Sequence, residues 1–196
     1  MEDMAFRDQH LALTWFLSLE PVLPTEMTGL WKGKGIPSGH PLDGVLENLN
    51  WFGKRFHADQ RADALLFQWR ERRLVALEPA YMPIRWVIRL APLGHSSLAR
   101  KLLSYSHKAL QARGPTASLT LRTSQYDETA AMVYDKQPIS DYFRRISENE
   151  LAGMMVVRGD ERRYFFSLKR SVASPSGKND PALPLSSNQP GALLSG

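Results

Sequence analysis

Residues 28–35 read Thr-Gly-Leu-Trp-Lys-Gly-Lys-Gly, which places one tryptophan among three glycines. Glycines at this density in a strand mark a bulge or the close approach of another backbone. Because side chains alternate between the two faces of a strand, Trp31 faces inward when the two lysines face solvent. Gly33 then leaves room for a neighbouring strand or for Trp51. The stretch predicts the first strand of a small closed β structure, with Trp31 filling one end.

Short runs of aliphatic and aromatic residues, separated by polar turns, recur along the rest of the chain. They predict strands at residues 51–57, 64–69, 74–77, 119–122, 130–134, 151–157 and 164–168. Within the first of these, simple alternation puts Trp51 and Lys54 on opposite faces. Many short strands at regular spacing are typical of a β-barrel or a β-sandwich.

Helices separate some of these strands. Helical periodicity predicts helices at residues 6–19, 42–49, 96–113 and 139–146, whereas residues 84–90 fit either a helix or a strand. The first helix either packs over the core or forms a lid over a barrel mouth. The helix at 96–113 is basic and amphipathic, so it either packs on the sheet or rests on a membrane surface as a peripheral contact. Packing on the sheet is the commoner arrangement.

Composition excludes several function classes. Cysteine is absent, which rules out disulfides, thiolate nucleophiles and cysteine-ligated metals. The net charge of +5 is spread along the chain, and no basic-aromatic motif accompanies it, so we expect no nucleic-acid partner. The apolar run at 11–19 lacks a basic leader and a small-residue cleavage site, and it is too short to span a bilayer. We therefore expect a cytoplasmic protein.

The chain divides into three parts. Residues 1–24 form an N-terminal helix or lid, residues 25–170 form the β domain, and residues 171–196 form a tail. Proline, serine and glycine make up half of the tail, which contains no aromatic residue, so we expect it to be disordered.

Several blocks carry a resemblance to a known family. In the first half they are Gly29-Leu30-Trp31-Lys32-Gly33, His40-Pro41-Leu42-Asp43-Gly44 and Trp51-Phe52-Gly53-Lys54-Arg55-Phe56. In the second half they are Ala130-Ala131-Met132-Val133-Tyr134-Asp135, Gln137-Pro138-Ile139, Asp141-Tyr142-Phe143-Arg144 and the closing run at residues 164–170. Together they resemble the GXWXG domain family (25–80) followed by its usual C-terminal domain of unknown function (115–170). One departure is Tyr126-Asp127-Glu128, where relatives tend to carry arginine and glycine after the tyrosine.

The resemblance implies a mainly β (α+β) fold, an antiparallel lipocalin-like β-barrel with N-terminal and inserted helices. The glycine-tryptophan strand is similar to the opening of lipocalins and of nitrobindin-type haem barrels, whose interiors hold one apolar ligand. The five histidines do not suit haem, because none lies in the closing strands, where a nitrobindin-like barrel carries its iron ligand. No two histidines have a tight metal-ligand spacing either. We therefore expect neither haem, nor another cofactor, nor a metal.

Binding of a small hydrophobic or amphipathic molecule is the leading function class. A ligand pocket needs an apolar lining with a few polar anchors. Eight residues of the matched blocks are candidates for that lining, although most large apolar side chains of any barrel simply fill its core: Trp31, Trp51, Phe52, Lys54, Arg55, Phe56, Met132 and Phe143.

A cofactor-independent isomerase or cyclase is the alternative, acting on a polyketide- or terpenoid-like molecule of secondary metabolism. The candidate general acids and bases are His40, Asp43, Tyr134 and Asp135. Structural duties compete with these roles. Asp43 can brace the helix that follows it, and Asp135 suits a turn or an ion pair with Lys54 or Arg55. The sequence leaves both function classes open.

Overall fold

The computed structural model describes residues 4–69, 73–81, 84–98, 101, 106, 109–123 and 128–171, and all structural statements concern these residues. The helical elements are α1 (Gln9–Ser18), η1 (Pro24–Met27), α2 (Val45–Asn48), η2 (Pro79–Tyr81), α3 (Ile84–Arg89) and α4 (Ala91–Gly94). The strands are β1 (Glu20–Pro21), β2 (Gly29–Ile36), β3 (Trp51–Phe56), β4 (Arg61–Trp69), β5 (Arg73–Ala76), β6 (Ala117–Thr123), β7 (Glu128–Tyr134), β8 (Ile139–Ser147), β9 (Glu150–Val157) and β10 (Arg163–Arg170).

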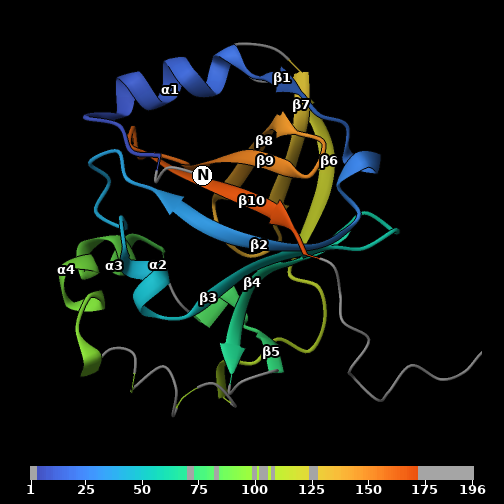
Figure 1. Cartoon of the computed structure of the whole chain (residues 1–196). Coiled ribbons are helices and arrows are strands. Elements are labelled where there is room, and N and C mark those ends of the chain that lie inside the picture. The colour runs from blue at the N-terminus through green and yellow to red at the C-terminus, as the bar shows by residue number, and fades with distance from the viewer. Residues whose placement is uncertain are drawn as a thin grey trace, which may run out of the picture.

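Eight strands close into an antiparallel barrel. Around the ring, β2 pairs with β3, β3 with β4, β4 with β6, and the order then follows the chain to β10, which pairs back with β2. Two short strands lie outside the ring, since β5 extends β4 as a hairpin and β1 pairs with β8. The mainly β, lipocalin-like barrel predicted from the sequence is confirmed (Figure 1).

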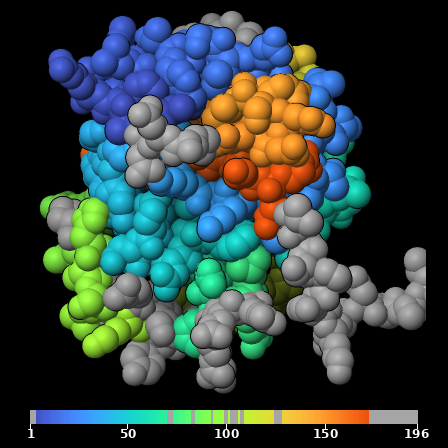
Figure 2. Space-filling model, in the orientation of Figure 1, coloured from blue at the N-terminus to red at the C-terminus, as the bar shows by residue number. Residues whose placement is uncertain are grey.

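The barrel has one core inside its wall and a smaller one outside. Large side chains fill the inside, among them Trp31, Trp51, Phe56, Met132, Phe143, Tyr164 and Phe166. Outside the wall, α1 lays Ala12 and Phe16 against Met154 and Phe165. Figure 2 shows the blue N-terminal residues packed against the orange C-terminal strands. The N-terminal helix therefore covers a side of the barrel, where it buries apolar residues that alternate with those facing inward.

The glycine-tryptophan strand has the predicted geometry. Trp31 is buried inside the barrel, whereas Lys32 and Lys34, which follow it on the same strand, are exposed. A Cβ on Gly33 would lie 2.3 Å from the ring of Trp51. Gly33 is therefore the residue that admits the second tryptophan, as the sequence predicts.

The predicted alternation along β3 is wrong because the strand contains a bulge. The pairing register with β4 shifts on both sides of Gly53, whose φ is +144°. The extra residue brings Trp51 and Lys54 to the same, inner face of the barrel. A Cβ on Gly53 would lie 2.1 Å from the carbonyl oxygen of Trp31, so the bulge requires glycine.

The helix predicted at 139–146 is also wrong, because these residues form β8. Ile139, Asp141 and Phe143 face the barrel interior, while Arg144 faces outward and is buried beneath α1. A charged residue on the inner face (Asp141) and an aromatic residue on the outer face (Tyr142) remove the alternation of apolar and polar residues by which a half-exposed strand is recognised.

The wall is joined most weakly between β4 and β6. Only Arg61 and Ala62 of β4 pair with β6, opposite Ser118 and Ala117, before β4 turns to β5 instead. The segment between β5 and β6 carries α3 and α4, so residues 84–89 are helical. At the end of the helix predicted at 96–113, Gln111 is not helical but forms an isolated antiparallel β-bridge with Leu77.

Part of that helix, the departure at 126–127 and the tail beyond residue 171 lie outside the described residues. Within the described part of the chain, no helix has the length and apolar character needed to cross a membrane.

Candidate functional site

Three polar side chains meet inside the barrel. The Nζ atom of Lys54 on β3 lies 2.8 Å from Oδ2 of Asp141 on β8, and both side chains are at least 97 % buried. Tyr134 on β7 donates its hydroxyl hydrogen to the same carboxylate oxygen at 3.3 Å. Lys54 also donates to the carbonyl oxygen of Ala64 at 3.1 Å and to the Tyr134 hydroxyl at 3.4 Å. The bulge at Gly53 makes this meeting possible, because without it Lys54 would face outward.

Aromatic rings surround the lysine. Its Nζ lies 5.1 Å from the centroid of the Phe166 ring and 5.7 Å from those of Trp51 and Tyr134. Trp51 meets Phe166 edge-on, with centroids 5.8 Å apart. Cation–π attraction at this range stabilises a buried ammonium group. The site is thus an ion pair enclosed by an aromatic lining.

Two polar atoms at this site have no hydrogen-bond partner in the described part of the chain: Oδ1 of Asp141 and Nε1 of Trp51. Buried polar atoms are nearly always paired, so each such atom calls for an explanation such as a bound water or ligand. Burial, followed by the charge of Asp141 and the hydrogen bond to it, raises the pKa of Tyr134 well above its usual value. Tyr134 therefore remains a protonated phenol that donates to Asp141.

His40 and Asp43 belong to the loop between β2 and α2. The Oδ2 atom of Asp43 accepts from the backbone N–H groups of Ser38, Gly39 and His40 at 2.9–3.0 Å. His40 is buried, its Nδ1 accepts from the backbone N–H of Leu42 at 3.1 Å, and its ring packs 5.5 Å from that of Tyr164.

Burial lowers the pKa of His40 to about 4, so its imidazole is neutral at neutral pH. Asp43 and His40 thus organise this loop, and neither contacts the Lys54–Asp141 pair by any hydrogen bond in the described part of the chain.

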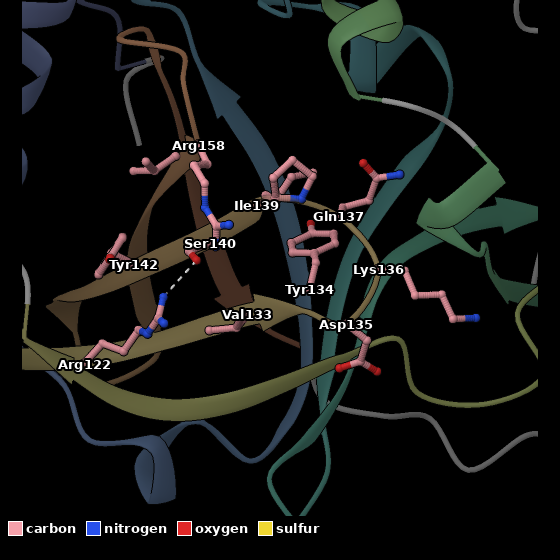
Figure 3. A pocket seen from close by; sticks show the side chains of 12 residues that line it. Arg122, Val133, Tyr134, Asp135, Lys136, Gln137, Ile139, Ser140, Tyr142 and Arg158 are labelled. Carbon is pink, nitrogen blue, oxygen red and sulfur yellow. Dashed lines mark hydrogen bonds between the residues drawn. The ribbon is translucent and has the colours of Figure 1, made fainter.

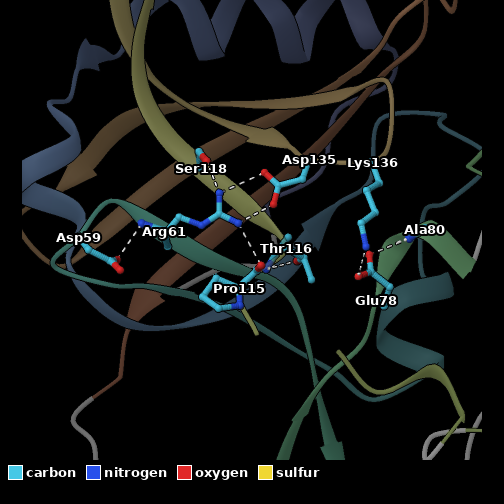
Figure 4. Close-up of polar contacts among 10 residues, drawn as sticks. Asp59, Arg61, Glu78, Ala80, Pro115, Thr116, Ser118, Asp135 and Lys136 are labelled. Carbon is cyan, nitrogen blue, oxygen red and sulfur yellow. Dashed lines mark hydrogen bonds and ion pairs between the residues drawn. The ribbon is translucent and has the colours of Figure 1, made fainter. Parts of the chain in front are cut away.

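Asp135 faces away from the barrel interior. Its two carboxylate oxygens accept from the guanidinium of Arg61, which also donates to Ser118 and to the carbonyl oxygen of Pro115 (Figure 4). The expected pairing of Asp135 with Lys54 or Arg55 is wrong, because these three residues have other partners: Arg61 for Asp135, Asp141 for Lys54 and Asp63 for Arg55. The Arg61–Asp135 ion pair thus acts as a clamp across the weakly paired junction of β4 and β6, which we call the seam.

The residues expected to line a ligand divide into two groups. Trp31, Trp51, Lys54, Phe56, Met132 and Phe143 lie inside the barrel, whereas Phe52 is half-buried outside that core and the side chain of Arg55 is 43 % exposed. Trp31 lies toward one end of the barrel. The guanidinium of Arg170 stacks on the indole ring of Trp31, 4.3 Å from the ring centroid, and Nε1 of Trp31 donates to the carbonyl oxygen of Met27 at 2.7 Å.

Asp141 is one of the polar residues of the matched blocks, but it was not chosen among the predicted site residues. In a strand, Ile139, Asp141 and Phe143 point to the same face. A charged residue between two apolar ones on one strand face is the sequence pattern that could have identified Asp141. The predicted helix at 139–146 hid that signal.

The described residues contain no group of three or more histidine, aspartate or glutamate side chains that could hold a metal ion.

Comparison with known proteins agrees with this architecture. The model of the GXWXG protein family matches residues 14–71, and that of a domain of unknown function (DUF4334) matches residues 115–170. The first match runs from within α1 to the end of β4, and the second covers β6 to β10, so each contributes part of one barrel.

A crystal structure of a protein from Thermomonospora curvata is similar to this chain, with a TM-score of 0.62 and 26 % sequence identity. The similarity covers 86 % of this chain and 90 % of that one. No curated protein matches the sequence significantly. Two family models in tandem thus account for every strand of the closed barrel, so the chain carries a segment that matches the GXWXG family followed by one that matches the DUF4334 domain.

Proposed function

We propose that the barrel binds a small amphipathic molecule whose polar group is held by Lys54, Asp141 and Tyr134. The observation that carries the proposal is the buried ion pair inside the aromatic lining. Burying a charged group costs roughly several kcal/mol per ion. A protein with two well-packed apolar side chains in place of a buried ion pair is often at least as stable. A polar cluster at the centre of an apolar barrel therefore favours a binding role over a purely structural one.

The polar groups indicate which ligand chemistry fits. Lys54 and Asp141 balance each other's charge, so the site favours an uncharged polar group over a carboxylate or an amine. The unpartnered oxygen of Asp141 accepts a hydrogen bond, whereas the unpartnered N–H of Trp51 donates one. A hydroxyl group both donates and accepts. The ligand class supported best is a neutral alcohol with an apolar body.

The test compares three probes of equal chain length, namely 1-decanol, decanoate and decylamine. We expect decanol to bind most tightly by isothermal titration calorimetry. The double variant Lys54→Met/Asp141→Leu should weaken decanol binding by about tenfold, the loss of roughly one good buried hydrogen bond. The matched control is Lys136→Met/Glu78→Leu, which removes an outer ion pair of 3.1 Å and should leave the affinity unchanged.

Two outcomes would contradict the proposal. One is the absence of binding of all three probes, and the other is equal affinity of decanol for the parent protein and the double variant. Native mass spectrometry of protein from its own host should in addition show a co-purifying apolar mass.

A cofactor-independent isomerase or cyclase is the second candidate, acting on a polyketide- or terpenoid-like molecule at the same site. The observation in its favour is a buried carboxylate with one unpartnered oxygen beside a phenol that stays protonated. Asp141 would take a proton from the ligand as general base, and Tyr134 would stabilise the developing oxyanion by donating a hydrogen bond.

Asp141→Asn distinguishes the two functions once the native ligand is known. An enzyme loses conversion of that ligand while retaining its affinity within a few-fold. A carrier returns the ligand unchanged from both proteins, as judged by chromatography of the extracted molecule.

A further inference from the structure

The outer wall of the barrel carries a pocket of about 630 Å³ on β7, β8 and β9 (Figure 3). Its floor is a row of register partners, in which Val133 of β7 is opposite Ser140 of β8 and Ser140 is opposite Val156 of β9. These three side chains alternate with Met132, Asp141 and Met155, which face inward. Tyr134 and Ile139, which belong to the barrel core, also line the pocket. Its volume lies within the range of small-molecule pockets, roughly 300–1,000 Å³.

Two arginines point toward the same hydroxyl group of this floor. Arg122 of β6 donates to Oγ of Ser140 at 3.3 Å, and the guanidinium of Arg158 approaches Ser140 from the opposite side (Figure 3). No carboxylate of the described residues forms an ion pair with either arginine. Two cations facing one neutral hydroxyl repel each other, and an anion between them would remove that repulsion.

The other charged residues of the pocket are already engaged. Asp135 pairs with Arg61, and Lys136 pairs with Glu78 at 3.1 Å. Arg85 does not line the pocket, but it lies next to Gly159, the residue after Arg158, where an added Cβ would be 3.1 Å from its Nη2. The pocket thus combines an apolar floor with two guanidinium groups that have donors to spare, which is the geometry that binds phosphate and carboxylate oxygens.

We propose that this pocket is a second binding site, for a small organic anion whose phosphate or carboxylate group lies between Arg122 and Arg158. The apolar part of the anion packs on Val133 and Val156. The site does not depend on the function proposed for the barrel interior, since none of these four residues contacts Lys54 or Asp141 by a hydrogen bond or an ion pair.

The experiment uses the full chain at low ionic strength with phenyl phosphate, benzoate and inorganic phosphate as probes. Binding is measured by calorimetry and by shifts of the amide resonances of residues 133, 140 and 156. We expect an aryl anion to bind, and Arg122→Gln and Arg158→Gln each to weaken it about tenfold, as expected for the loss of a charge-assisted hydrogen bond. Arg113→Gln, which removes an exposed arginine elsewhere, should change nothing.

Each outcome decides between alternatives. A preference for phenyl phosphate or for benzoate identifies which oxyanion the site takes, and either supports the proposal. Binding of inorganic phosphate as tight as that of phenyl phosphate overturns the role of the apolar floor. The proposal is also overturned when no probe binds, or when the two pocket variants behave like Arg113→Gln. Asp141→Asn should leave this binding intact, so a failure here is distinct from a failure of the interior site.

Discussion

At the scale of single residues, the Lys54–Asp141 ion pair is the feature that most distinguishes this barrel interior from an ordinary core. Both groups are buried, and they come from strands in different halves of the chain. Each partner is what makes the burial of the other tolerable, since an isolated buried charge is far costlier than a pair. The pair therefore behaves as one unit in stability as well as in binding.

Removing only the lysine should be more harmful than removing both charges. Lys54→Met leaves the Asp141 carboxylate unpaired, and we expect the free energy of unfolding to fall by about 3–5 kcal/mol. Lys54→Met/Asp141→Leu should recover much of that loss. Urea denaturation of the two single variants and the double variant gives the coupling energy. The Lys136–Glu78 pair is the control: the Lys136 side chain is 64 % exposed, so Lys136→Met should cost about 0–1 kcal/mol. Additive single effects at the buried pair would contradict this reasoning.

His40 should make stability depend on pH. Its pKa is lowered by burial to about 4 from 6.5, so the unfolded chain binds the proton more readily than the folded one. Stability is therefore fully present above pH 6.5 and falls as the pH drops toward 4, by up to about 3 kcal/mol. Chemical denaturation at several pH values should show that His40→Gln removes this slope. His10→Gln, at an exposed histidine, should keep it.

At the scale of elements, the bulge in β3 decides which residues enter the barrel. Gly53 adds a residue between Trp51 and Lys54, and so turns both side chains inward. Gly33 on β2 then provides the space that the Trp51 ring fills. The two glycines, on adjacent strands, together allow the side chains of Trp51 and Lys54 to lie inside the barrel.

Alanine at Gly53 should be much more damaging than alanine at another glycine of positive φ. At Gly53 the new Cβ would lie 2.1 Å from a backbone oxygen, whereas at Gly39, with φ +83°, nothing lies within 4 Å. Gly39→Ala should cost only the backbone strain, about 1 kcal/mol. Gly53→Ala should cost at least about 3 kcal/mol, because the backbone of β2 must move. Thermal denaturation of both variants tests this, and equal melting temperatures would argue against the role of the bulge.

At the scale of the whole molecule, the barrel wall has one seam of low strength. Only two residue pairs join β4 to β6, and the Arg61–Asp135 clamp lies across that seam (Figure 4). Elements with few shared hydrogen bonds open at a lower free energy than the rest of a domain. We therefore expect the barrel to open first along this seam.

Arg61→Gln should loosen the seam without unfolding the barrel. The expected loss is about 1 kcal/mol, because the clamp is partly exposed. Hydrogen exchange of the amides of Thr116 and Leu119, which donate across the seam, should accelerate about fivefold. The amides that join β8 to β9 serve as the internal control and should keep their rates. Uniform acceleration across all strands would show that the clamp supports the whole barrel rather than the seam.

Much of the architecture can be read from the sequence. The strand at Gly29–Ile36, with Trp31 inside and Gly33 beneath Trp51, follows from alternation and from the absence of a Cβ. Most strands of the second half follow from short apolar runs, and the closed barrel follows from the family blocks. These features depend on neighbours in the chain or on a repeated pattern, which is why the sequence alone determines them.

The candidate site was decided by tertiary structure. Lys54 enters the barrel through a bulge that simple alternation does not reveal, and Asp141 lies on a strand whose pattern is masked by α1 covering its outer face. Asp135 looked like a catalytic carboxylate, but its partner is Arg61, more than seventy positions away. Only contacts between distant strands determine which charges pair and which of them are buried, because the energy of a charge depends on its surroundings in space rather than on its neighbours in the chain.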